Sequence, residues 1–301
     1  MIEVFIKYIL VGLYIAVFAS SCANNQSDSR EGNVNLVVVT QEPRFDHLTW
    51  KIEAAYGSWY YEIEHLQTGE VSTGFNSAID KEGNDWIANN CEGRREWRGW
   101  PNFGPDGFGH PCRGGGGFSQ WVDEKNNRIE FDGYLEDEHL ILESWNDNYK
   151  VRYHFFYSHI AIEVIEADEP YAFLWEGPVA GKMNIDQQHY VLEDGQKREF
   201  AHGMGLGYLD PEFNRNFHSP FFYFLDDSAS HVVYIGVKNQ SEGGDEGWAQ
   251  PDNMIIFSFG REDDDHALTG IDAIAVFGFL DKSIGHEEMK SLIYSHLNEP
   301  F

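Results

Sequence analysis

Positive charge is scarce in this chain. Only 21 residues are Lys or Arg, against 50 that are Asp or Glu, which gives a formal net charge of −29. Proteins bind nucleic acids mainly by neutralising phosphates with cationic side chains, and adsorption to an anionic lipid surface needs the same cations. The deficit therefore argues against both functions and predicts a solvated, acidic exterior.

The sequence also lacks the common catalytic and cofactor motifs. It contains no HExxH, no GxSxG, no Walker loop, no dinucleotide fingerprint and no CxxC. We therefore predict no resident metal and no cofactor. The acidic run at residues 262–265 could bind calcium, but it does not match an EF-hand loop, and a solvated charge run is the simpler interpretation.

A membrane-spanning apolar run is missing as well. The run at residues 8–18 is too short for the hydrocarbon core of a bilayer, which needs about 20 helical residues. It follows a short segment with one Lys and precedes three small residues, an order typical of a secretion signal. We predict a signal peptide at residues 1–21, a polar flexible tether at 22–34 and a single domain at 35–301.

Cys22 directly follows Ala19, Ser20 and Ser21. This ending resembles the lipobox of bacterial lipoproteins. The resemblance implies that cleavage precedes Cys22 and that its sulfur carries a diacylglyceryl group. It places the protein at the bacterial outer membrane or cell surface, lipid-anchored on the periplasmic or extracellular face. An ordinary signal peptide with a chance Cys at the cleavage site is the alternative.

Cysteine is otherwise rare. The chain has three, and only Cys91 and Cys112 remain after Cys22. An even pair in an oxidising compartment usually forms a disulfide. This one would close a loop of about 20 residues, worth roughly 3 kcal/mol if it acts by restricting the unfolded chain.

Short stretches with β-strand patterns dominate the rest of the chain. The clearest pair, at 150–157 and 160–166, is separated by two residues and predicts a hairpin. Other strands are predicted at 35–40, 47–54, 60–65, 128–131, 139–145, 171–175, 189–192, 221–225, 231–237, 254–259 and 273–280. Residues 286–297 show helical spacing. We predict an all-β fold, a large antiparallel two-sheet sandwich with a short C-terminal helix.

The segment at 91–121 is rich in Gly, Pro, Trp and Arg, which predicts a long loop held by the disulfide. Exposed Trp rings stack on sugars, and an Arg fork fits a carboxylate or sulfate. His110 could serve as an acid, a base or a sugar ligand. The Arg residues could equally neutralise nearby acids. The predicted substrate-binding residues of this loop are Trp97, Arg98, Trp100, Arg113 and Trp121.

A second cluster lies at 200–224 and contains His202, Tyr208, Arg215 and His218. Sugar β-elimination needs such a set: a cation neutralises the uronate carboxylate, a His or Tyr takes the C5 proton, and another protonates the leaving oxygen. Hydrolysis instead needs two carboxyl groups. Glu176, beside a Trp at a predicted strand end, is the best single acid for that role and a predicted substrate-binding residue. A turn acid satisfied by backbone donors is the simpler interpretation.

The segment VRYHFFYSHIAIEVIEADEPYAFLWEG at 151–177 and the strand-rich region 221–280 resemble the antiparallel strands of galactose-mutarotase-like supersandwich proteins. That group includes sugar epimerases and polysaccharide lyase domains. The resemblance implies a carbohydrate-active fold, and the epimerases of the group use a His pair and a Glu on neighbouring strands. No residue of this chain is assigned to those positions. A lipid-anchored, aromatic-rich β protein is also similar to the polysaccharide-utilisation machinery of Bacteroidetes-type bacteria.

Two functions fit these features. The favoured one is a lipid-anchored polysaccharide-degrading enzyme, a lyase or a glycoside hydrolase, acting on a polysaccharide or oligosaccharide that could be anionic. The alternative is a surface glycan-binding lipoprotein without catalysis, in which the Trp residues of the 91–121 loop form a stacking platform.

Overall fold

The computed structural model describes residues 35–89, 98–103, 107–111, 116–200, 219–238, 246–250, 253–260 and 268–301. Asn35–Phe301 form one compact unit, and Met1–Val34, a separate unit, lie outside the described residues. The signal peptide, the lipidated Cys22, the tether and the location they imply therefore stay predictions. Within the described part of the chain, no helix has the length and apolar character needed to cross a membrane.

Antiparallel strands arranged in three sheets make up most of the described residues. The five-stranded sheet runs β4 (Phe75–Asp80), β3 (Gly57–His65), β2 (His47–Ala54), β1 (Val37–Arg44), β6 (Tyr134–Asp137). The three-stranded sheet runs β10 (Phe173–Gly177), β16 (Met254–Phe259), β15 (Glu246–Gln250). The nine-stranded sheet runs β12 (Lys197–Glu199), β11 (Gln188–Leu192), β13 (Phe221–Asp226), β14 (His231–Lys238), β17 (Ile274–Asp281), β9 (Ile160–Ala167), β8 (Tyr149–Phe156), β7 (His139–Trp145), β5 (Phe118–Val122).

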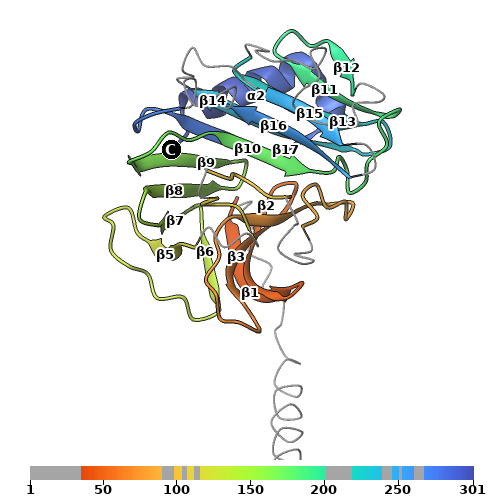
Figure 1. The fold of residues 1–301 in the computed structure, drawn as a ribbon. Coiled ribbons are helices and arrows are strands. Elements are labelled where there is room, and N and C mark those ends of the chain that lie inside the picture. The colour runs from red at the N-terminus through yellow and green to blue at the C-terminus, as the bar shows by residue number, and fades with distance from the viewer. Residues whose placement is uncertain are drawn as a thin grey trace, which may run out of the picture. The chain divides into compact units, whose positions relative to one another are not determined.

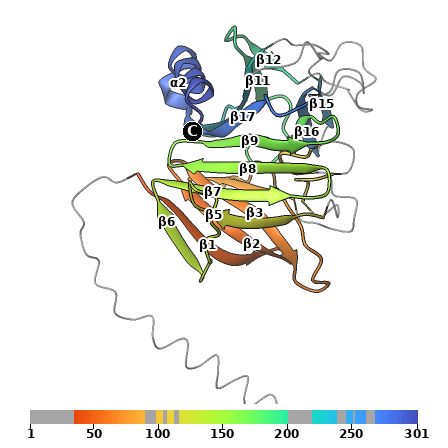
Figure 2. The same ribbon diagram turned by 90° about the vertical axis from the view of Figure 1, so that its left-hand side faces the viewer.

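Gly99 and Trp100 join the two smaller sheets. Gly99 forms a bridge to Glu176 of β10, and Trp100 forms one to Phe75 of β4. The Gly99 N–H donates to the Glu176 carbonyl at 2.8 Å, and the Phe75 N–H donates to the Trp100 carbonyl at 2.8 Å. The smaller sheets thereby form one layer of the sandwich, opposite the nine-stranded sheet. Figures 1 and 2 show β9, β8, β7 and β5 side by side, with β1 to β3 against them.

Aromatic side chains fill the space between the layers. The ring centroids of Trp59 in β3 and Phe277 in β17 lie 5.0 Å apart, edge to face. In the other half of the sandwich, Phe257 of β16 lies 4.9 Å from Phe222 of β13. All four side chains are buried. Aromatic pairs of this kind combine a large buried apolar area with a preferred geometry, so the high aromatic content mainly builds the core.

Helix α2 (His286–Asn298) covers part of the outer face of the nine-stranded sheet (Figure 1). Its Met289, Ile293 and Leu297 pack with residues of β14 and β17 in a second apolar cluster. The predicted helix is therefore confirmed. Leu292, three residues after Met289, is 37 % exposed, whereas Leu297, one turn beyond Ile293, belongs to the buried stripe.

The sheets confirm the predicted all-β, antiparallel sandwich with a short C-terminal helix. The predicted hairpin is also confirmed, because β8 and β9 pair antiparallel from Tyr149 opposite Ala167 to Phe155 opposite Ile160. Side chains alternate along β8, so Val151, Tyr153 and Phe155 point into the core.

The strand predicted at 128–131 is wrong. Only Arg128 forms a bridge, to Val122 at the end of β5. The preceding turn sets this geometry: the Asp123 carboxylate accepts the backbone N–H groups of Lys125 and Asn127, both at 2.8 Å. An Asp that binds the backbone two residues ahead favours a turn over an extended chain.

Candidate functional site

Many of the predicted site residues lie outside the described residues. They are Cys22, Cys91, Trp97, Cys112, Arg113, His202, Tyr208, Arg215 and His218. The calcium alternative at 262–265 lies outside them too. The disulfide, the lipid anchor and the second predicted cluster therefore stay predictions.

Trp100 and Trp121 lie in the core, contrary to the predicted stacking role. Their exposed fractions are 0 % and 1 %. The ring centroid of Trp100 is 5.9 Å from that of Trp175, and the Trp121 ring is 5.2 Å from Trp50. Neither ring offers a face to a ligand. Burial of such large apolar surfaces stabilises the sandwich, which is a sufficient reason for both residues.

Arg98 is committed to backbone and amide partners. Its Nη1 donates to the Ala88 carbonyl at 3.0 Å, and its Nη2 donates to Asn253 Oδ1 at 2.8 Å. These bonds connect three segments that are distant in sequence. The position supports a structural role for Arg98 rather than the predicted grip on a substrate anion.

The structure brings two predicted residues together, His110 and Glu176. His110 Nε2 lies 3.0 Å from Glu176 Oε2, and His110 Nδ1 lies 2.7 Å from the Pro111 carbonyl oxygen. Both side chains are buried, with 1 % and 5 % of their surfaces exposed. Glu176 sits on β10 directly beside the Gly99 bridge that joins the two smaller sheets.

The hydrogen bonds of His110 engage both of its ring nitrogens. A carbonyl oxygen only accepts, so His110 Nδ1 must donate to Pro111. Nε2 faces the Glu176 carboxyl group at hydrogen-bond distance, so both side chains are engaged within the protein. Glu176 is therefore not the open acid expected for hydrolysis, and the pair supports the junction between the sheets.

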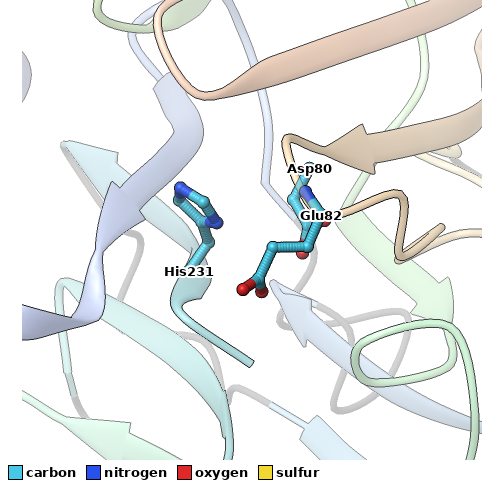
Figure 3. Close-up of side chains that lie close together, drawn as sticks. All are labelled: Asp80, Glu82 and His231. Carbon is cyan, nitrogen blue, oxygen red and sulfur yellow. The ribbon is translucent and has the colours of Figure 1, made fainter. Parts of the chain in front are cut away.

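Asp80, Glu82 and His231 form a possible metal-binding group (Figure 3). One donor atom from each lies within 4.8 Å of the others. The Asp80 carboxylate is already saturated, since it accepts the backbone N–H groups of Glu82 and Asn84 at 2.9 and 3.0 Å, the Asn84 amide at 2.9 Å and the Trp86 indole at 2.9 Å.

Glu82, the exposed member of this group, also makes a structural hydrogen bond. Glu82 accepts the backbone N–H of Ser230 at 2.9 Å, which connects the turn after β4 to the start of β14. The four donors on Asp80 occupy the lone pairs that a cation would need from that carboxylate. The residues therefore fit a loop contact better than a metal centre, and we assign no metal to them.

A group that sequence reasoning missed lies on the outer face of β5, β7, β8 and β9. Strand alternation sends His139 and Glu143 of β7 to this face, together with Arg152 and His154 of β8. Glu163 of β9 lies opposite Arg152 on the same face. The inward partners on these strands, among them Leu142 and Tyr153, belong to the core. The face is thus polar where the sheet is not covered by α2.

Glu143 is the centre of an ion row across this face. Its Oε1 lies 3.1 Å from Lys150 Nζ, and its Oε2 accepts from Arg152 at 3.1 and 3.2 Å. Gln120 of β5 donates to Glu143 at 3.3 Å. Arg152 also reaches Glu163 at 4.0 Å. Two cations and two carboxylates therefore balance, and each holds the next in place.

His139, His154 and Glu163 continue the row as a hydrogen-bonded chain, which we call the relay. His139 Nε2 lies 3.1 Å from His154 Nδ1, and His154 Nε2 lies 3.2 Å from Glu163 Oε2. His154 is almost fully buried, while His139 and Glu163 are half-buried. The hydrogen bond from His154 lowers the pKa of Glu163, so the carboxylate is ionised at neutral pH.

The ionised Glu163 fixes the tautomers of both histidines. It accepts from His154 Nε2–H, which leaves His154 Nδ1 to accept from His139 Nε2–H. The remaining nitrogen, His139 Nδ1, then carries a lone pair and has no hydrogen-bond partner among the described residues. Burial, followed by the neighbouring His154, lowers the pKa of His139, so the neutral, basic form prevails at pH 7.

Aromatic rings flank the relay on both sides. The Phe156 ring stacks on His139 with centroids 4.4 Å apart, and the Phe301 ring stacks on His154 at 4.6 Å. Phe301 itself is 52 % exposed. These rings hold the imidazoles parallel and shield His154 from water. A buried His between a carboxylate and a second His can orient and stabilise that second His as a base.

No protein family matches the sequence, and no curated protein does either. Among solved structures, the chain is similar to a putative mutarotase (YeaD) from Salmonella typhimurium, with a TM-score of 0.43, 11 % identity and coverage of 81 % of this chain and 94 % of the other. A galactose mutarotase-like protein from Clostridium acetobutylicum has a TM-score of 0.42 and 9 % identity, and the match covers 81 % of this chain and 98 % of the other. The alpha-N-acetylgalactosaminidase NagBb from Bifidobacterium bifidum has a TM-score of 0.40 and 11 % identity, and the match covers 82 % of this chain and 35 % of the other. Similarity this distant assigns no activity to this chain.

Proposed function

We propose that the protein is a carbohydrate-active enzyme that begins its reaction by taking a proton from a sugar, with His139 as the general base. One observation carries the proposal: His139, His154 and Glu163 form a hydrogen-bonded chain that ends in an unprotonated nitrogen on a sheet face. The polar outer face and its partly exposed cations supply donors and acceptors for sugar hydroxyls.

The relay would act as follows. His139 Nδ1 takes a proton from a sugar O–H or C–H, and the ring becomes an imidazolium. His139 Nε2–H keeps donating to His154, and His154 keeps donating to Glu163, whose negative charge stabilises the new positive charge through the shared hydrogen bonds. His154 and Glu163 are positioning residues in this scheme, because they act through His139.

β-Elimination is one reaction that this base would start. Removal of the C5 proton of a uronate sends the electron pair toward C4, where the C4–O bond breaks and an acid protonates the leaving oxygen. The reaction also needs a cation at the carboxylate. Arg152 is already compensated by Glu143 and Glu163. The role of Arg215 at the carboxylate stays a prediction, because that residue lies outside the described residues. Isomerisation of a sugar also needs a base, but it does not need a cation at a carboxylate.

The proposal is tested with His139→Asn. We expect kcat/KM to fall by about 10²- to 10⁴-fold, the usual contribution of a general base. Purified protein is incubated with alginate, ulvan, pectin, chondroitin sulfate and xylan. Ultraviolet absorbance detects an unsaturated product, a reducing-end assay detects hydrolysis, and polarimetry with free sugars detects isomerisation.

His65→Asn is the matched control, because His65 is a half-buried His on a different sheet. Wild-type turnover in His139→Asn would overturn the assignment of the base. Retention of a polysaccharide without any turnover in the wild-type protein would instead support the alternative, a glycan-binding protein without catalysis.

The location stays part of the proposal. We propose that Cys22 carries a lipid that anchors the protein to a bacterial membrane, as the residues before it suggest. Expression in a Gram-negative host, followed by membrane fractionation, tests this. Cys22→Ser should move the protein to the soluble fraction, and the mass of the wild-type N-terminal peptide should include the diacylglyceryl group. An unmodified Cys22 in membrane-free protein would refute the anchor.

A further inference from the structure

An exposed aromatic pair lies on the same sheet face as the relay, toward the other end of the strands. Phe118 of β5 lies opposite Trp145 of β7, with ring centroids 5.9 Å apart and planes inclined by 31°. Phe118 is 58 % exposed, and Trp145 is half-buried. The neighbours of Phe118 on β5 show the contrast, since Trp121 is in the core and Ser119 bonds to the buried Tyr61.

The fold does not account for Phe118. A ring that stays more than half exposed gains little from the hydrophobic effect, and it presents apolar surface to water on an otherwise acidic exterior. Two adjacent rings form a wider apolar platform than one. The flat C–H face of a sugar ring matches such a platform, because both surfaces are apolar and planar.

The residues next to the platform suit a sugar rather than an apolar partner. Trp145 lies opposite Lys150, and one row further along the strands Gln120, Glu143 and Arg152 lie side by side across the sheet. Lys150 and Arg152 are partly exposed here, and their N–H groups can donate to sugar hydroxyls. An apolar protein surface would have to remove these paired charges from water, which costs free energy even for an ion pair.

The distance between platform and base sets the length of the ligand. Trp145 and His139 are both on β7 and face outward, six residues apart, which corresponds to roughly 20 Å along a strand. A single sugar cannot contact both ends. A saccharide chain that lies along β7 and β8 can stack on the platform, cross the ion row and reach His139.

We infer that Phe118 and Trp145 form the distal subsite of a binding surface for a saccharide chain that extends along β7 and β8 to His139. The inference rests on the proposed function for the class of ligand. It adds that the ligand is an extended chain, and that its affinity depends on two aromatic side chains outside the relay.

Affinity electrophoresis tests the inference separately from catalysis. Native gels contain either xylan, a neutral polysaccharide, or alginate, pectin, ulvan or chondroitin sulfate, which are anionic. We expect retardation of the wild-type protein in at least one gel. The double variant Phe118→Ala/Trp145→Ala should bind about tenfold more weakly, a loss typical of removing an aromatic anchor. The polysaccharide that retards the protein then distinguishes a neutral from an anionic chain.

Two controls make the result specific. Tyr134→Ala removes an aromatic residue of similar exposure, 47 %, from the five-stranded sheet and should bind like the wild type. His65→Asn, on the five-stranded sheet, should also keep its retardation, because it lies on neither the platform nor the relay. Thermal unfolding of the double variant shows whether that variant is folded. If the double variant is unfolded, the single variant Phe118→Ala, which removes a mostly exposed ring, is used in its place.

The outcomes separate the two proposals. Weaker retardation of the aromatic variants, with normal retardation of Tyr134→Ala and His65→Asn, supports the subsite whether or not turnover is found. Equal retardation of the wild type and the aromatic variants overturns the subsite, even if His139 proves to be catalytic. Absence of retardation in all five gels also overturns it. A panel of short oligosaccharides should show affinity rising with chain length, and affinity independent of length would contradict an extended surface.

Discussion

At the scale of single residues, Glu163 decides how basic the relay is. Its carboxylate accepts from His154 Nε2, so it stabilises positive charge on the two histidines. The pKa of His139 is lowered by burial and by His154, while the charges of Glu124 and Asp137 oppose that effect. Glu163 acts on the relay through its hydrogen bond to His154. The rate should therefore fall as the pH drops through the pKa of His139, below its ordinary value of 6.5.

Glu163→Gln should move this acid limb. An amide keeps the size of the side chain but removes the charge, so protonation of the relay becomes harder and the acid limb of kcat/KM shifts to lower pH. The maximum rate should also fall, by about tenfold or more. The pH profile of kcat/KM is the measurement. Glu130→Gln, an exposed acid, is the control, and an unshifted limb in Glu163→Gln would contradict the relay.

At the scale of elements, two neutral histidines connect α2 to the nine-stranded sheet. The His296 ring of α2 stacks on His159 at 4.1 Å, and His296 Nδ1 lies 2.7 Å from the Tyr234 hydroxyl. His159 Nε2 donates to the Pro300 carbonyl at 3.3 Å. Burial lowers the pKa of His159 to about 3 and that of His296 to about 4.

These shifts make the attachment of α2 sensitive to acid. The unfolded chain protonates both histidines below their ordinary pKa of 6.5, whereas the folded chain resists protonation until the pH approaches 3 to 4. The stability that they contribute is therefore complete above pH 6.5 and is lost as the pH falls from there. Each group contributes on the order of a few kcal/mol to this change.

His159→Gln should weaken this pH dependence. Gln keeps a donor for the Pro300 carbonyl but does not titrate. The free energy of unfolding, measured with urea between pH 4 and pH 7, should fall less steeply toward acid than in the wild type. The variant should be somewhat less stable at pH 7 because the stack on His296 is lost. An identical slope in both proteins would show that His159 does not carry the effect.

At the scale of the whole molecule, net charge opposes folding. With a formal charge of −29, the compact state brings many carboxylates close together. Exposed ion pairs such as Arg198–Asp194, at 2.7 Å, contribute little because water screens them. Added salt screens both the repulsion among the surplus carboxylates and the attraction within such pairs. The stabilisation from the screened repulsion should be larger than the stability lost from the screened pairs.

Added salt should consequently raise the stability of the domain. We expect Tm to increase by a few degrees between low-salt buffer and buffer with sodium chloride near 0.5 M, where the Debye length has shortened to roughly 4 Å. Calorimetry at constant pH measures it. Potassium chloride should act alike if the effect is screening. A fall in Tm with either salt would show that attractive pairs dominate.

Local pattern was sufficient for many elements of this fold, but it gave a wrong strand at 128–131 and missed short strands such as β5 and β6. Alternation in β8 and β9 predicts both their hairpin and the inward direction of Tyr153, because the two strands are neighbours in sequence. The spacing of Met289 and Ile293 likewise predicts α2. Composition predicts the acidic exterior. Each of these depends on residues within a few positions of one another, so no long-range information is needed.

Only tertiary packing decided the candidate site. His110 and Glu176, 66 residues apart, meet because Gly99 and Trp100 bridge two sheets. The same closure buries Trp100, which composition alone would place on a sugar. His139, His154 and Glu163 each look ordinary in the sequence. They form a relay because the pairing register of β7, β8 and β9 sets them on one face, and register depends on contacts that the whole sandwich makes together.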